Sequence, residues 1–591
     1  MKRNTTTTIR GISLLFVALA LTSTIFILAG CSRKSGEYTL KVLTTNDVHG
    51  SWFDSTYVDD NVRTSLIGAK YYVDSVRTAS GSDNVLLIDA GDVLQGNNAA
   101  YYFNYVDTQT PHLYPRMAKY MGYDVVTVGN HDVETAHPVY DRVAKELKAA
   151  GIPFLGGNAI RNDDGKSYFD EYAVIKRAGL KVLVLGYSNA NIAAWLDESI
   201  WSGMHFVSLI PLVQNSVDAI KAKVKPDVTI VSVHSGTGEG NGEILESQGL
   251  DLFKSLSGVD FLLCAHDHRA VTFQNDSICL INSGSHARNL GYGEITVTKE
   301  KGKVVSKKLS AGLIAVDKNK GDQAMRDLFH KDYEAVKAFT VREIGSLDMD
   351  LRSRDAYPGM CDYMNLIHTV QLKSTDAQIS FAAPLTQNGV VKAGTLIFND
   401  MFTIYPFENQ LYKLNLKGSE IKDYLEYSYS LWIQTYDAQH VLRIAEREDS
   451  RYGRKNWSFI SPSFNFDSAA GIIYSVDVTK KMGDRIDIKS LADGTPFDMD
   501  ATYSVAMTSY RASGGGDLLF KGAGLQRDEL AERTVARYPE IRNLIYDFIS
   551  ENVVVNHVLV SDYDLLGYWS FMPQPVADMA IAKDMALMFG E

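Results

Sequence analysis

The chain has 591 residues, of which 45% are hydrophobic and 22% are charged. These fractions are ordinary for globular proteins, and the length predicts more than one domain. The formal net charge of −12 argues against a surface that binds a nucleic acid polymer. A small phosphate ester remains compatible with this charge, provided that its binding cleft is locally positive.

The first thirty residues have the pattern of a secretion signal, with basic residues followed by an apolar stretch from about 12 to 28. This stretch ends in Leu28-Ala29-Gly30-Cys31, which resembles the bacterial lipobox, whose Cys becomes the lipidated first residue. The alternative is an uncleaved membrane anchor, because about 17 apolar residues approach a membrane-spanning length. The small pair before Cys31 favours cleavage. We predict a signal peptide over 1–30, a polar tether over 31–37 and a lipoprotein anchored outside the cytoplasm through Cys31.

Five short peptides bring together residues that bind metals. Each follows an apolar, β-branched run, which is typical of a strand buried on both faces of a sheet. Ligands of such sheets collect at the carboxyl ends of the strands, where these peptides fall. The peptides are Thr45-Asn46-Asp47-Val48-His49, Ala90-Gly91-Asp92, Gly129-Asn130-His131-Asp132, Val233-His234-Ser235-Gly236 and Ala265-His266-Asp267-His268.

A single Asp or His after a strand is usually a capping or loop residue. The Asp-x-His and His-x-His pairs are more specific, because alternate residues of an extended segment project to the same side. Five such peptides together predict a site for two divalent ions that share a carboxylate. An arrangement of this kind suits phosphoester hydrolysis.

At these residues the chain resembles the calcineurin-like metallophosphoesterases, and more narrowly the two-domain 5′-nucleotidase and 2′,3′-cyclic-nucleotide phosphodiesterase family. The resemblance implies a layered αββα-type catalytic domain, a smaller α+β nucleotide-binding domain and two divalent ions, with Zn, Mn, Co and Fe all possible. It assigns Asp47, His49, Asp92 and His268 to the first ion, and Asp92, Asn130, His234 and His266 to the second.

The same resemblance makes His131 a catalytic residue that faces the phosphate and does not bind metal. Family members often have an Asp three residues later that orients this His. Glu134, one methylene longer, occupies that position here. His286 lies in a loop that borders the metals in related sequences, and we expect it to lie near the ligands without being one.

Alternating strand and helix patterns place the catalytic domain at 38–317. Helical spacing from 318 to 340 predicts a connecting helix whose apolar stripe contains Met325, Leu328, Phe329, Tyr333 and Val336. In the family such a helix joins two domains whose relative rotation moves the substrate to the metals. Three cysteines remain: Cys264 and Cys279 could form a disulfide, and three buried thiols, including Cys361, are the alternative.

The second domain, from about 341 to 555, has no cluster of metal ligands in its sequence and leaves a tail, 556–591, unassigned. In the family, two aromatic residues of this domain sandwich the nucleobase, and Phe466 and Tyr510 occupy the matching positions. Packing in the core is the alternative for either ring alone. Tyr510 is followed by Gly514-Gly515-Gly516, which would let the backbone approach a ligand closely. We therefore predict substrate binding by Phe466, Tyr510, Gly514 and Gly515.

Two segments of the second domain indicate which class of nucleotide is the substrate. Where 5′-nucleotidases have glycines and an Arg that contacts substrate, this chain has Ser380-Phe381-Ala382-Ala383-Pro384. That segment and Tyr510-Arg511-Ala512-Ser513-Gly514-Gly515-Gly516 resemble the 2′,3′-cyclic phosphodiesterase/3′-nucleotidase branch. We predict that activity on small nucleotides, with a 5′-nucleotidase or UDP-sugar hydrolase as the alternative. A family relative that acts on a non-nucleotide ester or a sulfur compound and an inactive nucleoside-binding lipoprotein are more remote.

Overall fold

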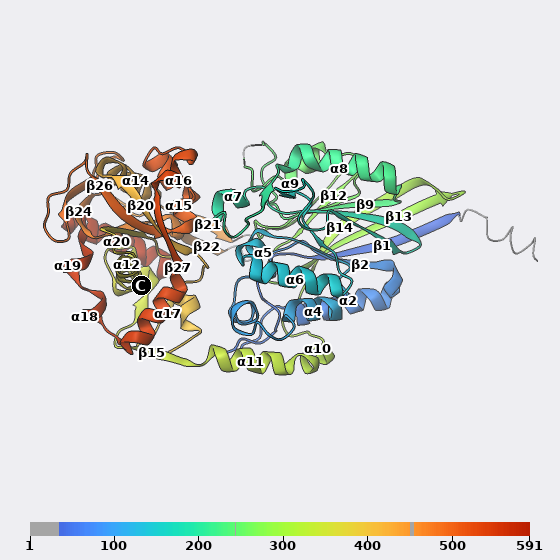
Figure 1. Cartoon of the computed structure of the whole chain (residues 1–591), viewed down its shortest axis with the longest axis horizontal. Coiled ribbons are helices and arrows are strands. Elements are labelled where there is room, and N and C mark those ends of the chain that lie inside the picture. The colour runs from blue at the N-terminus through green and yellow to red at the C-terminus, as the bar shows by residue number, and fades with distance from the viewer. Residues whose placement is uncertain (1–34, 243, 450–453, 591) are drawn as a thin grey trace, which may run out of the picture.

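In the computed structural model, which describes residues 35–242, 244–449 and 454–590, the chain forms two domains side by side. Figure 1 shows the amino-terminal domain on the right and the carboxyl-terminal domain on the left. The predicted signal peptide and Cys31 lie outside the described residues. Within the described residues, no helix has both the length and the apolar character needed to cross a membrane.

The amino-terminal domain is built on two six-stranded sheets. In order across the first sheet, the strands are β14 (Lys303–Ala315), β13 (Asn289–Glu300), β1 (Gly36–Thr45), β2 (Val85–Asp89), β3 (Val125–Thr127) and β4 (Phe154–Leu155). Across the second they are β11 (Ala270–Gln274), β12 (Cys279–Ser283), β10 (Phe261–Leu263), β9 (Val228–Val233), β7 (Leu180–Tyr187) and β6 (Tyr172–Arg177). Gly36 and Glu37 already pair with β13, so the strand begins inside the predicted tether.

The two sheets face each other across an apolar core, and helices cover their outer faces. Side chains from both sheets, such as Val42 and Ile230, are fully buried in the layer between them. Helices α2 (Leu66–Ser80), α4 (Leu113–Met121) and α6 (His137–Ala149) pack against the first sheet. Helices α8 (Leu209–Val224) and α9 (Gly249–Ser255) cover the second, as Figure 1 shows. The predicted αββα layering is confirmed.

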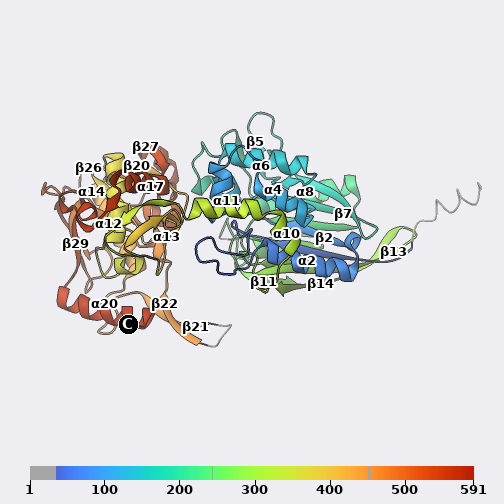
Figure 2. The same cartoon turned by 90° about the horizontal axis from the view of Figure 1, so that it is seen from below.

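Two helices lead from the first domain to the second. They are α10 (Gln323–Leu328) and α11 (His330–Thr340), where the sequence predicted one connecting helix. Met325, Phe329 and Val336 are buried against the amino-terminal domain, whereas Leu328 is 55% exposed and does not belong to the apolar stripe. Phe339, near the end of α11, packs into the core of the other domain. Figure 2 shows α11 passing between the two domains.

The carboxyl-terminal domain is an α+β structure around a five-stranded sheet. Across this sheet the strands are β23 (Ser468–Ala470), β17 (Ile379–Ala382), β26 (Thr502–Thr508), β20 (Gln410–Lys417) and β27 (Thr534–Glu540). The principal helices are α12 (Asp362–Thr375), α14 (Gly418–Trp432) and α17 (Ile541–Asn552). A hairpin, β21 (Ile444–Asp449) and β22 (Arg454–Phe459), projects from the domain in Figure 2.

The segment after 555, which the sequence left unassigned, belongs to this second domain. Strand β29 (Gly567–Met572) pairs in parallel with β24 (Ile472–Asp477), which pairs on its other side with β25 (Ile486–Leu491). Helix α20 (Gln574–Phe589) follows, and its buried Asp584 accepts hydrogen bonds from the backbone N–H groups of Val441 and Leu442, both at 2.8 Å. The second domain therefore extends to the end of the described chain.

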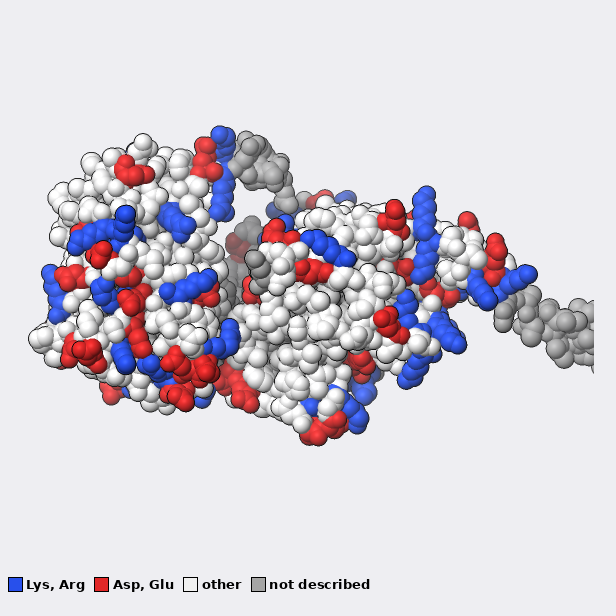
Figure 3. Space-filling view, turned by 90° about the horizontal axis from the view of Figure 1, so that it is seen from above, with Lys and Arg blue, Asp and Glu red and all other residues white. Residues whose placement is uncertain are grey.

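Charged residues of both signs are interspersed over the face in Figure 3. On this face neither sign forms a continuous field.

Candidate metal centre and substrate pocket

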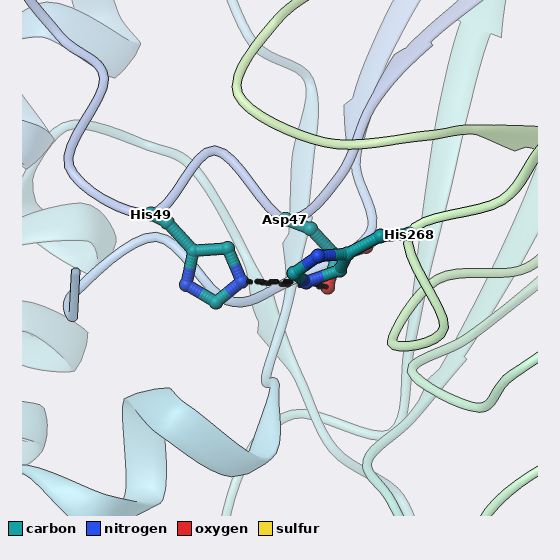
Figure 4. A group of neighbouring side chains, drawn as sticks. All are labelled: Asp47, His49 and His268. Carbon is teal, nitrogen blue, oxygen red and sulfur yellow. Dashed lines mark hydrogen bonds and ion pairs between the residues drawn. The ribbon is translucent and has the colours of Figure 1, made fainter. Parts of the chain in front are cut away.

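Asp47, His49 and His268 form the first of two groups of metal-ligating side chains. Asp47 and His49 follow β1, and His268 follows β10 (Figure 4). The Nε2 atoms of the two histidines are 2.9 Å apart, and they lie 3.9 and 3.6 Å from Oδ1 of Asp47. The ligand atoms of all three side chains are within 4.8 Å of one another, so one cation could contact them together.

Asp92, His234 and His266 form the second group, whose ligand atoms are again within 4.8 Å of one another. Nε2 of His234 is 2.9 Å from Oδ2 of Asp92. The amide oxygen of Asn130 lies 3.0 Å from Nδ1 of His266. Nε2 of His234 is also 3.9 Å from Oδ1 of Asp47, so the two groups adjoin. The structure thus brings all seven predicted metal ligands together.

The donors in these groups fit divalent cations. The Nδ1–H of His234 donates to the carbonyl of Ala90 at 2.8 Å, which fixes Nε2 as the free ligand atom. That Nε2 is buried and has no well-aligned hydrogen bond, but it lies 2.9 Å from Oδ2 of Asp92, whose charge outweighs burial and raises the pKa of His234 to about 9. Burial lowers the pKa of His49 and lowers that of His266 to about 3, so both imidazoles are neutral, as a metal ligand must be. Imidazole and carboxylate donors together accept zinc, manganese, cobalt or iron.

Two glycines make the close approach of the ligand loops possible. A Cβ on Gly91 would lie 2.7 Å from Nδ1 of His234, and Gly91 has a φ of +100°. A Cβ on Gly129 would lie 2.0 Å from Oδ1 of Asp92. Five ligand residues, Asp47, His49, Asp92, His266 and His268, themselves have φ between 47° and 73°. Such backbone strain is characteristic of functional sites.

Asp132 supports the ligand loops and was missed by the sequence analysis. Its carboxylate accepts hydrogen bonds from the backbone N–H groups of Gly129 at 2.8 Å and of Asp92 at 3.0 Å. It also accepts from Val93 and Leu94, both at 2.9 Å. One buried carboxylate therefore fixes the loop of Asp92 against the loop of Asn130. Its place directly after the Gly-Asn-His motif was the signal that could have identified it.

His131 and Glu134 lie where the sequence predicted a catalytic pair. Both are in the short helix α5 (Asn130–Glu134), and the Glu134 carboxylate is hydrogen-bonded to Nδ1 of His131. The longer side chain thus reaches the ring, which leaves Nε2 available to a substrate. Burial disfavours protonation of His131, but the charges of Glu134 and Asp92 outweigh it and raise the pKa of His131 to about 10.

His286 and the three cysteines of the described residues are not members of either group of metal-ligating side chains. The ring centroid of His286 is 5.6 Å from that of His49, while its Nδ1 is 3.2 Å from Ser51 Oγ, so it borders the first group. Cys264, Cys279 and Cys361 are free thiols. Cys279 lies in the core between the sheets and Cys264 in the core outside the second sheet, which excludes a disulfide between them.

A pocket of about 320 Å³ extends from the metal-ligating residues into the carboxyl-terminal domain. This volume is in the range of small-molecule sites. The first domain contributes Asn130, His131, Glu134, Trp195, Leu196, Glu246 and His266; the second contributes Phe381, Ala382, Ala383, Leu385, Phe407, Asn409, Phe464, Asp467, Thr508, Ser509, Tyr510 and Arg511. Trp195, at the end of α7 (Ile192–Trp195), stacks on the ring of His266 with the centroids 5.3 Å apart.

The structure corrects the predicted stacking residue Phe466. Its side chain is fully buried in the core of the second domain, where it stacks on Trp432 at 5.8 Å and contacts the ring of Phe459. Phe464, two residues earlier, is 37% exposed and lines the pocket with Tyr510. Phe464 lies in a short 3-10 turn, Ser463–Asn465, and Phe466 directly follows it, so the two rings point to different sides although they are only two positions apart.

Tyr510 lies in the pocket as predicted, and the glycines after it support its ring. A Cβ on Gly515 would lie 2.4 Å from the Tyr510 ring, and one on Gly514 would lie 2.2 Å from Phe520. Neither glycine is among the residues that line the pocket, and both leave room for a neighbouring ring to pack. The buried Arg511 forms an ion pair with Asp467 at 2.9 Å and is hydrogen-bonded to the carbonyl of Phe464. This ion pair, which the sequence analysis missed, joins the segments of Phe464 and Tyr510.

Polar contacts hold the two domains against each other. Arg537 of the second domain forms an ion pair with Asp197 of the first at 2.7 Å. Asn98 donates to the side-chain oxygen of Asn399 at 2.8 Å, and Tyr101 donates to that of Asn543 at 3.0 Å. These contacts join the two domains whose residues line the pocket together.

The fold and this set of donors are those of a metal-dependent phosphoester hydrolase. Residues 40–270 match the calcineurin-like phosphoesterase model, and residues 340–522 match the C-terminal domain of 5′-nucleotidases. The chain belongs to the calcineurin-like phosphoesterases that carry a 5′-nucleotidase C-terminal domain. The family resemblance seen in the sequence is confirmed.

Individual relatives are distant in sequence. The chain is 22% identical to the trifunctional nucleotide phosphoesterase protein YfkN of Bacillus subtilis, over 92% of this chain and 40% of that protein. It is 23% identical to a 2′,3′-cyclic-nucleotide 2′-phosphodiesterase/3′-nucleotidase of Salmonella typhimurium, over 84% of each. A Staphylococcus aureus structure described as a 5′-nucleotidase is 19% identical, with a TM-score of 0.73 over 90% of this chain and 99% of that one.

Proposed function

We propose that this protein hydrolyses small nucleotides at two divalent metal ions, as a 2′,3′-cyclic-nucleotide phosphodiesterase and 3′-nucleotidase. The observation that carries the proposal is the single pocket shared by the two domains. It is lined by His131 and the metal-ligating His266 from the first domain and by Phe464 and Tyr510 from the second. A phosphate bound at one end and a base stacked at the other would together span such a pocket.

The residues around the metal groups have separable roles in this proposal. Two cations held by these residues would activate water for attack and offset the charge of the phosphate. Asn130 and His131 offset the charge that develops on the non-bridging oxygens of the phosphate. His131 also donates a proton to the leaving sugar oxygen from Nε2, while Glu134 holds the ring in orientation through Nδ1. Positioning and electrostatics are the main contributions that phosphoryl transfer requires from a protein.

The segment Ser380–Pro384 supports the cyclic and 3′ specificity. Three of its residues, Phe381, Ala382 and Ala383, line the pocket and offer no cationic side chain to a substrate. Arg511 lines the pocket as well, but its guanidinium is held by Asp467. Curated relatives with the cyclic phosphodiesterase/3′-nucleotidase name align with more than four-fifths of both chains.

A substrate comparison tests this proposal. We expect the metal-loaded protein to hydrolyse 2′,3′-cAMP and 3′-AMP with kcat/KM values at least about 10-fold above those for 5′-AMP and UDP-glucose, a difference of about 1.4 kcal/mol in transition-state binding. The measurement is initial-rate phosphate or nucleoside release across the four substrates. A preference for 5′-AMP or UDP-glucose would replace the proposal with the 5′-nucleotidase alternative. No hydrolysis of any of them, with both metals bound, would reject nucleotide hydrolysis.

We also propose that Cys31 is lipidated and anchors the enzyme outside the cytoplasm. The support is the small pair Ala29-Gly30 before the Cys. We expect the wild-type protein, expressed in a bacterium, to enter the membrane fraction and to incorporate a labelled fatty acid. Cys31→Ser should lose the label, whereas Cys361→Ser serves as a matched control and should keep it. Labelling that persists in Cys31→Ser would contradict the assignment.

A further inference from the structure

Glu246 is an ionisable residue that lines the pocket, and it has no role in the proposed reaction. Its backbone carbonyl accepts hydrogen bonds from Gly236 N–H at 3.0 Å, Ser235 Oγ at 3.1 Å and Asn189 Nδ2 at 3.2 Å. These contacts fix the backbone of Glu246 beside the strand end that carries His234. The side chain is therefore presented to the pocket from a well-anchored position.

The carboxylate of Glu246 retains capacity to accept hydrogen bonds. Among the described residues its one hydrogen bond is a long contact of 3.5 Å from Asn191 Nδ2. A carboxylate has about four acceptor positions, so most of them are unused. The side chain is half-buried, and burial raises its pKa. A partly desolvated carboxylate that faces a pocket gains strongly from a donor on the ligand.

Glu246 lines the same pocket as Tyr510 and Phe464. Its charge helps to raise the pKa of the Tyr510 phenol, after burial and against the effect of Arg511. Asp517, which follows the glycines of the same loop, in turn helps to raise the pKa of Glu246. The rings of Phe464 and Tyr510 can stack on any base, because every base has a π-face. Discrimination among bases therefore requires a polar group in the pocket.

We propose that Glu246 accepts a hydrogen bond from the exocyclic amino group of the nucleobase, so that cytosine and adenine are preferred over uracil. This inference rests on the proposed hydrolysis of nucleotides and adds the base preference to it. Cytosine presents an amino donor at the position where uracil presents a carbonyl. A carboxylate attracts the former and repels the latter, as Asp and Glu do when they read cytosine in nucleic acids.

The test compares 2′,3′-cCMP with 2′,3′-cUMP in the metal-loaded protein. We expect wild-type kcat/KM to favour cCMP by about 10-fold or more, the size of a hydrogen bond to a charged group. Glu246→Gln should reduce this ratio to near one, because an amide can donate to the uracil carbonyl as well as accept from the cytosine amine. The lost preference should appear in the KM values for cCMP and cUMP. The kcat on bis(p-nitrophenyl) phosphate and the metal content should stay unchanged.

Glu239→Gln provides a matched control, because Glu239 is on the same loop with a side chain that is 73% exposed. It should keep the wild-type ratio. A wild-type ratio near one, or a ratio that Glu246→Gln leaves unchanged, would overturn the inference while nucleotide hydrolysis stands. If the loaded protein hydrolyses no nucleotide at all, both the proposed function and this inference are rejected together.

Discussion

Replacing Asp92 with Asn should remove at least one of the two metal ions and lower kcat/KM on 2′,3′-cAMP on the order of 10³-fold or more. Asp92 is 1% exposed, and its carboxylate contacts His234 at 2.9 Å and accepts from the backbone N–H of His131 at 2.8 Å. Neighbouring histidines, first His234, overcome the effect of burial and hold the pKa of Asp92 well below its usual value. Asn keeps the shape of the side chain but supplies no charge to the cations.

His131→Ala is the control for this experiment, because His131 is proposed to act on the phosphate and not on the metal. It should lower kcat by about 10²-fold or more while both metals stay bound. Elemental analysis and steady-state kinetics on the same preparations separate the two effects. An Asp92→Asn protein with two metals and normal turnover would reject the assignment of Asp92 as a shared ligand.

Replacing Phe464 or Tyr510 with Ala should weaken nucleotide use by about 1–3 kcal/mol, the cost of losing one base–aromatic stack. Both rings line the pocket, and the Arg511–Asp467 ion pair connects their segments. Hydrolysis of a small ester without a base should change much less, provided that its aryl groups do not use the same rings. The ratio of kcat/KM for 2′,3′-cAMP to that for bis(p-nitrophenyl) phosphate measures the difference.

Phe466→Ala is the contrasting variant. Because Phe466 is fully buried against Trp432, its removal should lower the free energy of unfolding by about 3–5 kcal/mol. Phe464→Ala should change that free energy far less, since its ring is partly exposed. A Phe466→Ala protein that folds stably and loses nucleotide affinity, beside a Phe464→Ala protein that keeps it, would show that Phe466 and not Phe464 stacks on the base.

The layered domain and its ligands could be predicted because both depend on local patterns. A β-branched run that ends in Asp or His specifies a buried strand and a ligand in the same few residues, as at β1 with Asp47 and His49. The layered fold then brings the ends of separate strands together. The role of Asp132 was not predicted, because its hydrogen-bond partners are backbone N–H groups and the amino-acid sequence does not show which backbone groups lie near a side chain.

The second domain was harder to predict because its contacts join distant segments. Phe464 and Phe466 are chemically alike, and only the packing of Phe466 against Trp432 of α14 decides which one is exposed. The strand β29 completes a sheet with β24, from which it is separated by about ninety residues of chain. The role of Glu246 likewise depends on the second domain, which places Tyr510 beside a loop of the first.

The most direct test of the account is anomalous diffraction from crystals of the protein loaded with Mn²⁺ or Zn²⁺. We predict two anomalous peaks about 3.5–4 Å apart, the spacing of two-metal phosphoesterase sites. One should be bound by Asp47, His49 and His268, the other by Asn130, His234 and His266, with Asp92 contacting both. A single peak, or peaks away from these residues, would contradict the two-metal centre on which the proposed hydrolysis depends.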